Sequence, residues 1–166
     1  EALLVWTTTP WTLTTNVAVA VNPEITYVKV RHEDEILYLA KATLPRLFPK
    51  TETLQELPGR DLLDMEYDGP FDELDAVKQS GTNAKHRVIP WKDVSELEGT
   101  GLVHVAPGAG KEDFALGKEF GLTILSPLNE YGIFTEGYGG YTGVHVYDSP
   151  DKIINALESK RLLFKV

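Results

Sequence analysis

The chain has 166 residues, about the size of one domain, and 42% of them are hydrophobic, which fits a globular protein that buries a sizeable core. Sixteen Lys and Arg against 25 Asp and Glu give a formal net charge of −9, so the chain does not hold an RNA backbone by bulk charge. It has no cysteine, which excludes disulfides and thiolate metal sites and favours a reducing compartment. With neither an apolar run of roughly 20 residues nor a secretion signal, we expect a cytoplasmic protein that makes no membrane contact.

The first half of the chain predicts short β-branched strands separated by turns. Pro10 ends the first strand, the threonine-rich residues 11–15 predict a polar turn, and Asn22-Pro23 predicts another turn. The strands are expected over residues 2–9, 17–21, 25–31, 35–40, 51–64 (a strand and its return) and 87–91, with one helical turn over 44–48. Residues 35–40 are expected to pair with the strand before them.

Residues 99–120 contain the densest set of local structure signals in the chain. A short strand is predicted over 102–105, with His104 among apolar neighbours, and the glycines and proline that follow break it. A helix is predicted over 111–120, with Asp113 in its first turn and Gly121 as its C-terminal stop.

The remaining segments predict a long excursion over 67–85, with a small helix at 72–78, a short strand over 123–126 and a glycine-rich loop over 132–143. A final helix to about residue 160 begins with Ser149 as N-cap and Pro150 at its first position. Many short strands and two clear helices predict an α+β fold, a mixed β-barrel-like sheet flanked by a few helices, in a single domain over residues 1–166.

Several kinds of chemistry are excluded by the motifs. A phosphate loop needs a glycine at position 105 and Ser or Thr after Lys111, whereas Val105 and Glu112 stand there. The dinucleotide fingerprint fails at His104, and neither a G-x-S-x-G elbow nor an H-E-x-x-H pair occurs. The four histidines lack metal-ligand spacing. We therefore expect no metal, no cofactor and no covalent serine intermediate.

Three features remain, and each has an ordinary structural explanation when taken alone. Thr7, Thr8 and Thr9 suit a strand by β-propensity. A lone His104 on an apolar strand is more often a core residue than a catalyst. Asp113 in a first helical turn is favoured by the helix dipole, by roughly 0.3–1 kcal/mol.

The combination of these features resembles one family. VWTTTPWTLTTNVAVAVNP, followed by GTGLVHVAPGAGKEDFALGKEFGL and the tail YTGVHVYDSPDKIINALESKRLLFKV, closely resembles the editing (CP1) domain inserted in isoleucyl-tRNA synthetases, which are class I aminoacyl-tRNA synthetases. Related valyl and leucyl domains carry a TTRP-like run, whereas Thr9 occupies the arginine position here and Trp11 follows the proline. Thr14, where proline is common, and Ala109, where histidine or phenylalanine is common, depart from the family pattern.

This resemblance implies post-transfer editing, the second sieve for which isoleucyl-tRNA synthetase is a standard example. The reaction would be hydrolysis of the ester of mischarged valyl-tRNA(Ile), with isoleucine excluded and valyl-adenylate as a further possible substrate. The chain would be a monomeric editing domain excised from a larger synthetase, without amino-acid activation because the ATP-binding motifs are absent. Its partners would be the 3′ end of mischarged tRNA(Ile), the valine moiety and the remainder of the parent synthetase.

The same resemblance assigns roles to six residues. Asp113 would bind the α-ammonium group of the substrate. The hydroxyls of Thr7, Thr8 and Thr9 would hydrogen-bond the substrate and the attacking water. Trp11 and His104 would form the walls of the substrate pocket, with His104 excluding the extra methylene of isoleucine.

Two alternatives stay open at this point. One is a valyl- or leucyl-type relative, or a free-standing aminoacyl-tRNA deacylase, with the same chemistry and another substrate. The other is a non-catalytic insert that binds RNA ends or packs against another domain.

Overall fold

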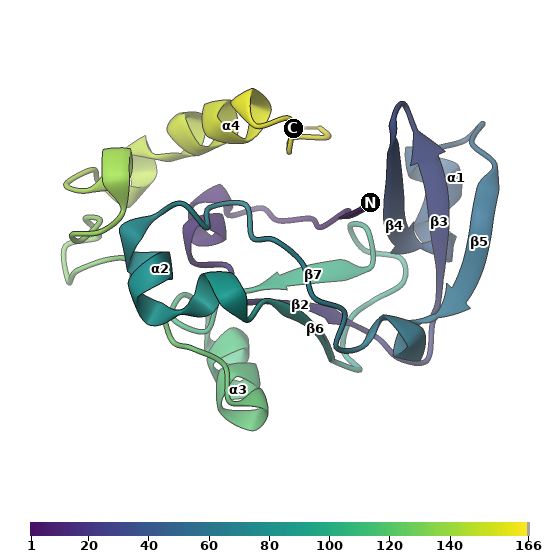
Figure 1. The fold of residues 1–166 in the computed structure, drawn as a ribbon, viewed down its shortest axis with the longest axis horizontal. Helices are drawn as coiled ribbons and strands as arrows, with labels where there is room; N and C mark the ends of the chain where they lie inside the picture. Colours follow the sequence, from purple (N-terminus) through teal and green to yellow (C-terminus); the bar gives the residue numbers. More distant parts are fainter. Residues whose placement is uncertain (166) are drawn as a thin grey trace. The chain divides into compact units, whose positions relative to one another are not determined.

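A computed structural model describes residues 1–165 and divides the chain into two compact units (Figure 1). Both units are built from separate stretches of sequence. The first unit contains Glu1–Thr7, Ala18–Glu66 and Arg87–His104, and the second contains Thr8–Val17, Tyr67–His86 and Val105–Val166.

A four-stranded sheet lies in the first unit, in the order β1-β4-β3-β5. Its strands are β1 (Ala2–Leu3), β3 (Thr26–His32), β4 (Glu35–Ala40) and β5 (Thr53–Pro58). β3 is antiparallel to both β4 and β5, whereas β1 runs parallel to β4. The predicted pairing of residues 35–40 with the strand before them is therefore confirmed. A four-residue helix, α1 (Leu44–Leu47), follows β4.

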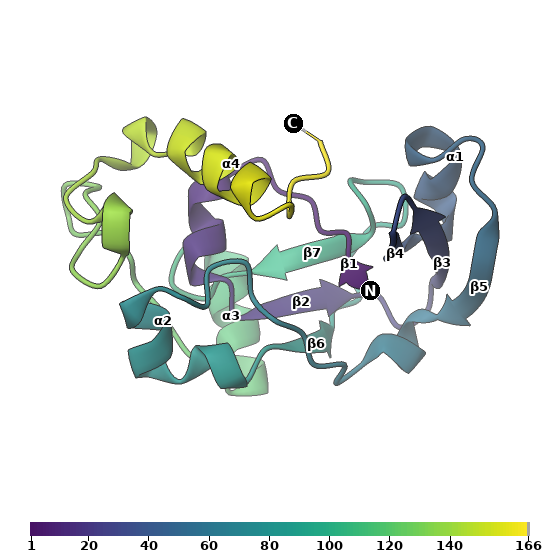
Figure 2. The same ribbon diagram turned by 45° about the horizontal axis from the view of Figure 1, so that its top comes forward.

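A three-stranded sheet has the order β6-β2-β7. Its strands are β2 (Ala18–Val21), β6 (Arg87–Pro90) and β7 (Leu102–Val105). β2 and β6 are parallel, and β2 and β7 point in opposite directions (Figure 2). Every residue of β2 is buried, which explains why its sequence, AVAV, is apolar on both faces.

The turn before β7 is fixed by a close approach to β4. Gly101 has φ of +75°, and a Cβ added there would lie 2.3 Å from the Cβ of Ala40. The buried hydroxyl of Tyr27 donates to the carbonyl of Gly101 at 2.7 Å. Only glycine satisfies both the left-handed backbone and the tight contact, so this position sets where β7 begins.

The second unit is helical and loop-rich. It contains a 3₁₀ helix, Pro10–Thr15, and the helices α2 (Asp75–Ser80), α3 (Lys111–Phe120) and α4 (Pro150–Ser159). Its apolar side chains form one buried cluster, made of Leu13, Val17, Phe71, Leu74, Val77, Leu125, Phe134, Tyr138, Tyr141, Ile153 and Leu157. The cluster joins α4 to the 3₁₀ helix, so the threonine-rich segment rests on a packed core.

The predicted α+β class is confirmed, and the strands of residues 1–165 form two sheets that do not close into a barrel. α3 occupies residues 111–120 as predicted and ends at Gly121 in the left-handed conformation. The final helix is also confirmed, although the Ser149 hydroxyl donates to the Val146 carbonyl instead of capping the helix. The prediction of a single domain over residues 1–166 stays a prediction.

Four sequence-based expectations were wrong in detail. Residues 2–9 form only the short β1 and an isolated bridge at Trp6, because the threonines continue toward the 3₁₀ helix. The threonine-rich residues after Pro10 coil into that helix instead of a simple turn. After β5 the chain enters another 3₁₀ helix, Gly59–Leu62, and forms no return strand. Residues 123–126 form no regular element and join neither sheet described for residues 1–165.

Candidate active site

The threonine-rich segment is organised by its own side chains. Within the 3₁₀ helix, three hydroxyls each donate to the carbonyl three residues earlier, Thr12 to Thr9, Thr14 to Trp11 and Thr15 to Thr12, at 2.8, 2.8 and 3.0 Å. These local bonds favour a tight helical turn over a strand. They also fix the backbone of Thr9 at the start of the helix.

Thr8 and Thr9 present their side chains to solvent at that start, and their Oγ1 atoms lie 3.5 Å apart. Trp11 is partly buried and packs against the apolar cluster of the second unit. The second unit therefore holds two exposed hydroxyls beside an anchored indole. Such an arrangement can orient a small polar ligand or a water molecule.

Thr7 and His104 belong to the first unit. An isolated parallel bridge joins Trp6 to Val103, the residues directly before Thr7 and His104. The Trp6 ring also covers Gly99, where an added Cβ would approach the ring to 2.9 Å. This bridge joins the residue before the threonine segment to β7, directly before the two predicted site residues.

His104 is buried on β7, with 7% of its surface exposed. Burial lowers the pKa of its imidazole from 6.5 to about 4, because an apolar environment disfavours the charged form. The ring is therefore neutral near pH 7. A neutral, buried imidazole is suited to forming a rigid wall and is a weak proton acceptor.

Asp113 lies in the first turn of α3 and is partly buried. Its Oδ2 accepts the backbone N–H of Ala106 at 3.0 Å. Desolvation raises the pKa of this carboxyl, the Ala106 N–H opposes that rise, and Glu112 adds to it. A Cβ at Gly110 would lie only 3.2 Å from the Asp113 Cγ, so the glycine gives this carboxyl room.

Of the six predicted site residues, Thr8, Thr9, Trp11 and Asp113 lie in the second unit, and Thr7 and His104 in the first. The Oγ1 atoms of Thr8 and Thr9 lie 3.5 Å apart, and an isolated bridge pairs the residues directly before Thr7 and His104. The roles predicted for these residues stay predictions.

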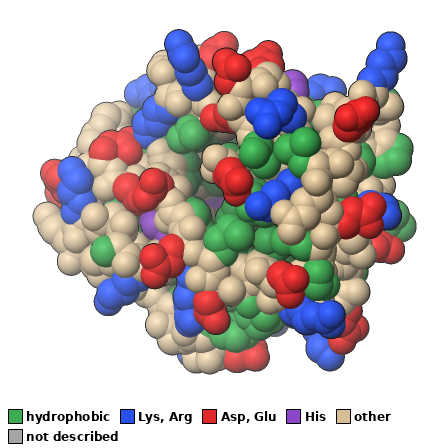
Figure 3. Space-filling model, turned by 45° about the vertical axis from the view of Figure 1, so that its right-hand side comes forward, with side chains coloured by type: hydrophobic (Ala, Val, Ile, Leu, Met, Phe, Trp, Pro, Cys, Tyr) green, Lys and Arg blue, Asp and Glu red, His purple; other side chains and the backbone are tan. Residues whose placement is uncertain are grey.

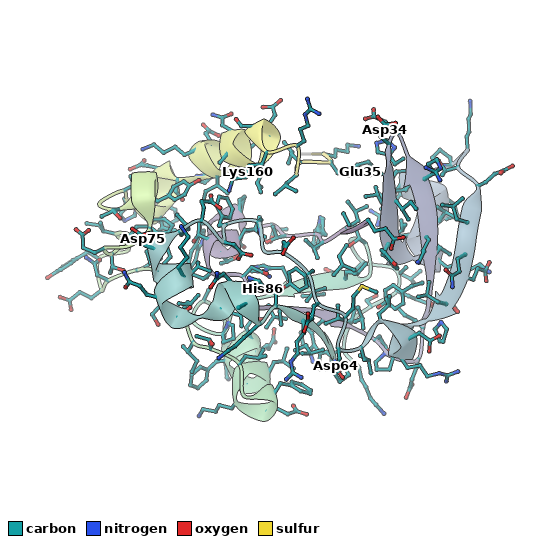
Figure 4. The ribbon with its side chains drawn as sticks, in the orientation of Figure 1. Asp34, Glu35, Asp64, Asp75, His86 and Lys160 are labelled. Carbon is teal, nitrogen blue, oxygen red and sulfur yellow. The ribbon has the colours of Figure 1, made fainter. Side chains whose placement is uncertain are left out.

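Sequence reasoning missed a buried polar cluster in the second unit. It centres on His86, which is 2% exposed and is labelled in Figure 4, and includes Asp72 and Tyr67. The polar residues 67–85 predict a long excursion, and His86 falls between that segment and the strand predicted over 87–91, so nothing drew attention to it. The available signal was a histidine directly before a strand, at the end of a segment rich in Gly, Pro and Asp.

An open depression of about 570 Å³ also lies in the second unit, between α2 and the start of α4. None of the six predicted residues lines it. Its lining consists of Glu73, Leu74, Asp75, Gly139, Gly140, Tyr141 and Lys152.

Among residues 1–165, no group of three or more His, Asp or Glu side chains could hold a metal ion. No helix in the same range is long and apolar enough to cross a membrane. On the face shown in Figure 3, acidic and basic side chains are interspersed, so that face offers no continuous basic surface.

No family model matches the chain. Among curated proteins it is similar to the isoleucine–tRNA ligase of Methanothermobacter marburgensis, with 42% identity over 164 residues that cover 98% of this chain and 15% of that protein. The isoleucine–tRNA ligase of Pyrococcus abyssi is 42% identical over 176 residues, covering 99% and 16%. The chain thus spans about 15% of the length of these relatives.

Solved structures share the fold. A crystal structure of GlLeuRS-CP1 superposes with a TM-score of 0.74 at 16% identity, covering 96% of this chain and 80% of that one. The editing domain of the cytosolic leucyl-tRNA synthetase of P. knowlesi superposes with a TM-score of 0.67 at 10% identity, covering 95% and 81%.

Proposed function

This chain belongs to the editing-domain (CP1) family of the aminoacyl-tRNA synthetases, and from that premise we propose that it hydrolyses the ester of valyl-tRNA(Ile) and rejects isoleucine. The observation that carries the proposal is the match to isoleucine–tRNA ligases, about 40% identical over nearly the whole chain. In the reaction, the oxygen of water adds to the ester carbonyl and the bond to the ribose oxygen breaks. Valine leaves, and the terminal ribose hydroxyl regains its proton.

Asp113 is the residue we propose for the α-ammonium group of the aminoacyl moiety. A carboxylate has two oxygens with about four acceptor positions, and the Ala106 N–H occupies one position on Oδ2. A bound ammonium would supply the positive charge that a partly desolvated carboxylate lacks. Binding would therefore favour the ionised form of a group whose pKa burial has raised.

Thr7, Thr8 and Thr9 are proposed to hold the substrate and the attacking water. Hydroxyls donate and accept hydrogen bonds, and those of Thr8 and Thr9 are exposed at a backbone position that the 3₁₀ helix fixes. An ester already has an adequate leaving group. Orientation of water against the carbonyl could then supply much of the rate, with the ribose hydroxyl of the substrate available to take part.

Trp11 and His104 are proposed as walls of the substrate pocket. The indole of Trp11 is anchored on a packed core, and the His104 ring is held on a buried strand. Rigid walls can exclude a larger substrate far more strongly than attraction can select a smaller one. The neutral His104 ring would contact an aliphatic side chain without placing a charge against it.

The acidic balance of the chain fits a division of labour in a longer synthetase. We propose that the remainder of the parent enzyme binds the tRNA body, while this monomeric domain receives the 3′ end in the cytoplasm. Valyl-adenylate is a second substrate that the same site could take.

One experiment tests the proposed function. The chain is incubated separately with tRNA(Ile) charged with valine and with isoleucine, and release of each amino acid is followed. Rapid loss of valine alone is the expected result. Loss of both amino acids, or preference for another one, would point to a valyl-type, leucyl-type or general deacylase. Loss of neither would point to a non-catalytic insert.

A further inference from the structure

We propose that His86, oriented by Asp72, is a positioning residue that holds the Asp113 carboxylate in place through a hydrogen-bonded backbone path. The whole path lies in the second unit. The effect on the reaction rests on the proposed role of Asp113, whereas the path itself rests only on the geometry.

His86 is enclosed by three partners. Its Nε2 lies 2.7 Å from Oδ1 of Asp72 and its Nδ1 lies 3.1 Å from the carbonyl of Val17. The ring of Tyr67 stacks on the imidazole, with centroids 5.0 Å apart. The second oxygen of Asp72 accepts the N–H of Gly69 at 2.8 Å. The imidazole therefore has little freedom to turn.

The two nitrogen partners of His86 are both acceptor groups unless the carboxyl of Asp72 carries a proton. A carbonyl can only accept, so the contact with Val17 requires a proton on Nδ1. The contact on the other side joins Nε2 to Oδ1 of Asp72 and holds the ring in that orientation. Asp72 thus acts through His86, and His86 acts on the backbone of Val17.

The backbone of Val17 links His86 to the loop before α3. Its N–H donates to the carbonyl of Val105 at 2.9 Å, while its own carbonyl contacts His86. The Val105 carbonyl and the Ala106 N–H belong to one planar peptide group. That peptide accepts from Val17 at one end and donates to Oδ2 of Asp113 at the other, at 3.0 Å. Holding Val17 therefore fixes the peptide that orients the carboxylate.

The polar cluster around His86 is also hydrogen-bonded to the end of the threonine-rich 3₁₀ helix. The Tyr67 hydroxyl donates to Oδ1 of Asn16 at 2.6 Å, and the Asn16 N–H donates to the carbonyl of Leu13 within the 3₁₀ helix. That helix begins beside Thr9. The predicted excursion over 67–85 and the adjoining His86 are thereby connected to both polar parts of the second unit.

Two substitutions of His86 separate positioning from packing. In His86→Asn the amide nitrogen takes the place of Nδ1, which keeps a donor for Val17 and loses the contact with Asp72. In His86→Gln the amide reaches toward Asp72 and loses the contact with Val17. Glu73→Gln is the matched control. Glu73 is next to Asp72 in the sequence, but its side chain pairs with Lys160, at the C-terminal end of α4.

The kinetic readout is hydrolysis of valyl-tRNA(Ile). His86→Gln is expected to lower kcat about 10- to 100-fold with KM within about twofold, because a misplaced carboxylate leaves the substrate badly oriented. His86→Asn should retain kcat within about threefold, and Glu73→Gln should match the unmodified chain. Equal losses in both His86 variants would indicate packing alone and overturn the proposal.

The second readout is hydrogen exchange at the Ala106 amide, which needs no activity. Exchange should be faster in His86→Gln than in His86→Asn or Glu73→Gln, all three compared by NMR under the same conditions. Unchanged exchange in His86→Gln would overturn the path. If the unmodified chain hydrolyses no ester, the proposed function fails, and the exchange experiment still decides whether His86 holds this peptide.

Discussion

His86 and His104 are both buried histidines, 2% and 7% exposed, yet their surroundings differ in kind. His86 is clamped between a carboxylate and a backbone carbonyl, beneath a tyrosine ring. His104 lies on a strand whose other residues are apolar, and burial is the cause of its lowered pKa. The hydrogen bonds around His86 fix the orientation of its ring, whereas the burial of His104 disfavours its charged form.

The difference shows that burial alone does not define the role of a histidine. Where both nitrogens meet acceptors, the ring transmits orientation from one segment to another. Where desolvation dominates, the ring stays neutral, which suits the wall role proposed for His104. Substitutions at the two sites test this contrast.

Asp113→Ala should lower valine release by at least about 100-fold, since it removes the carboxylate at the end of the His86 path. The measurement is single-turnover hydrolysis of valyl-tRNA(Ile). An active Asp113→Ala variant would refute the ammonium role.

Asp113→Asn should be similarly inactive, yet more stable at neutral pH. The folded state raises the pKa of this carboxyl, so stability falls as pH rises between the unfolded and the folded pKa values. Thermal melting should show this gain in stability near pH 7 and its disappearance in acid.

His104→Ala should let isoleucine be attacked, raising release of isoleucine about tenfold or more while valine release persists. The physical reason is that the wall of the pocket recedes. His145→Ala supplies the control, because His145 is only partly buried and belongs to the second unit. Unchanged discrimination in His104→Ala would show that the sieve lies elsewhere.

Two glycine substitutions probe the supports of the two histidines. Gly101→Ala, before β7, combines φ of +75° with a 2.3 Å approach to the Ala40 Cβ and should cost about 3 kcal/mol of unfolding free energy. Gly69→Ala would place a Cβ 2.5 Å from both Asp72 Oδ1 and His86 Nε2 and should cost about 2 kcal/mol. Urea unfolding measures both, with Gly140→Ala as control because nothing lies near its added Cβ.

Acid should weaken the fold partly through His104. Its folded pKa is depressed from 6.5 to about 4, so below pH 6.5 the unfolded chain binds the proton first and stability falls with falling pH. The expected loss from this group is about 2 kcal/mol between pH 6.5 and about 5. Urea unfolding across that range should show a smaller loss in His104→Gln, and parallel curves for the two proteins would contradict the prediction.

Local signals predicted those elements that local chemistry controls. α3 and α4 appear at their expected positions because Gly121 stops one and Pro150 starts the other. β4 and β7 appear because short apolar runs lie between turn residues. The strand expected over 2–9 is shorter than predicted, and the residues from Pro10 form a 3₁₀ helix because hydroxyl-to-carbonyl bonds within it favour a tight turn, which β-propensity does not register.

The class of the fold, helices α3 and α4 and the editing-family resemblance could be predicted from local sequence patterns. The same patterns indicated the candidate residues Thr7, Thr8, Thr9, His104 and Asp113. Tertiary structure alone decided that β2 pairs with both β6 and β7, and that His86 contacts Asp72 and Val17 across 14 and 69 residues of sequence. It also decided that burial makes His104 neutral. The physical reason is that hydrogen-bond partners and desolvation depend on residues distant along the chain, whereas turns, caps and periodicity depend on near neighbours.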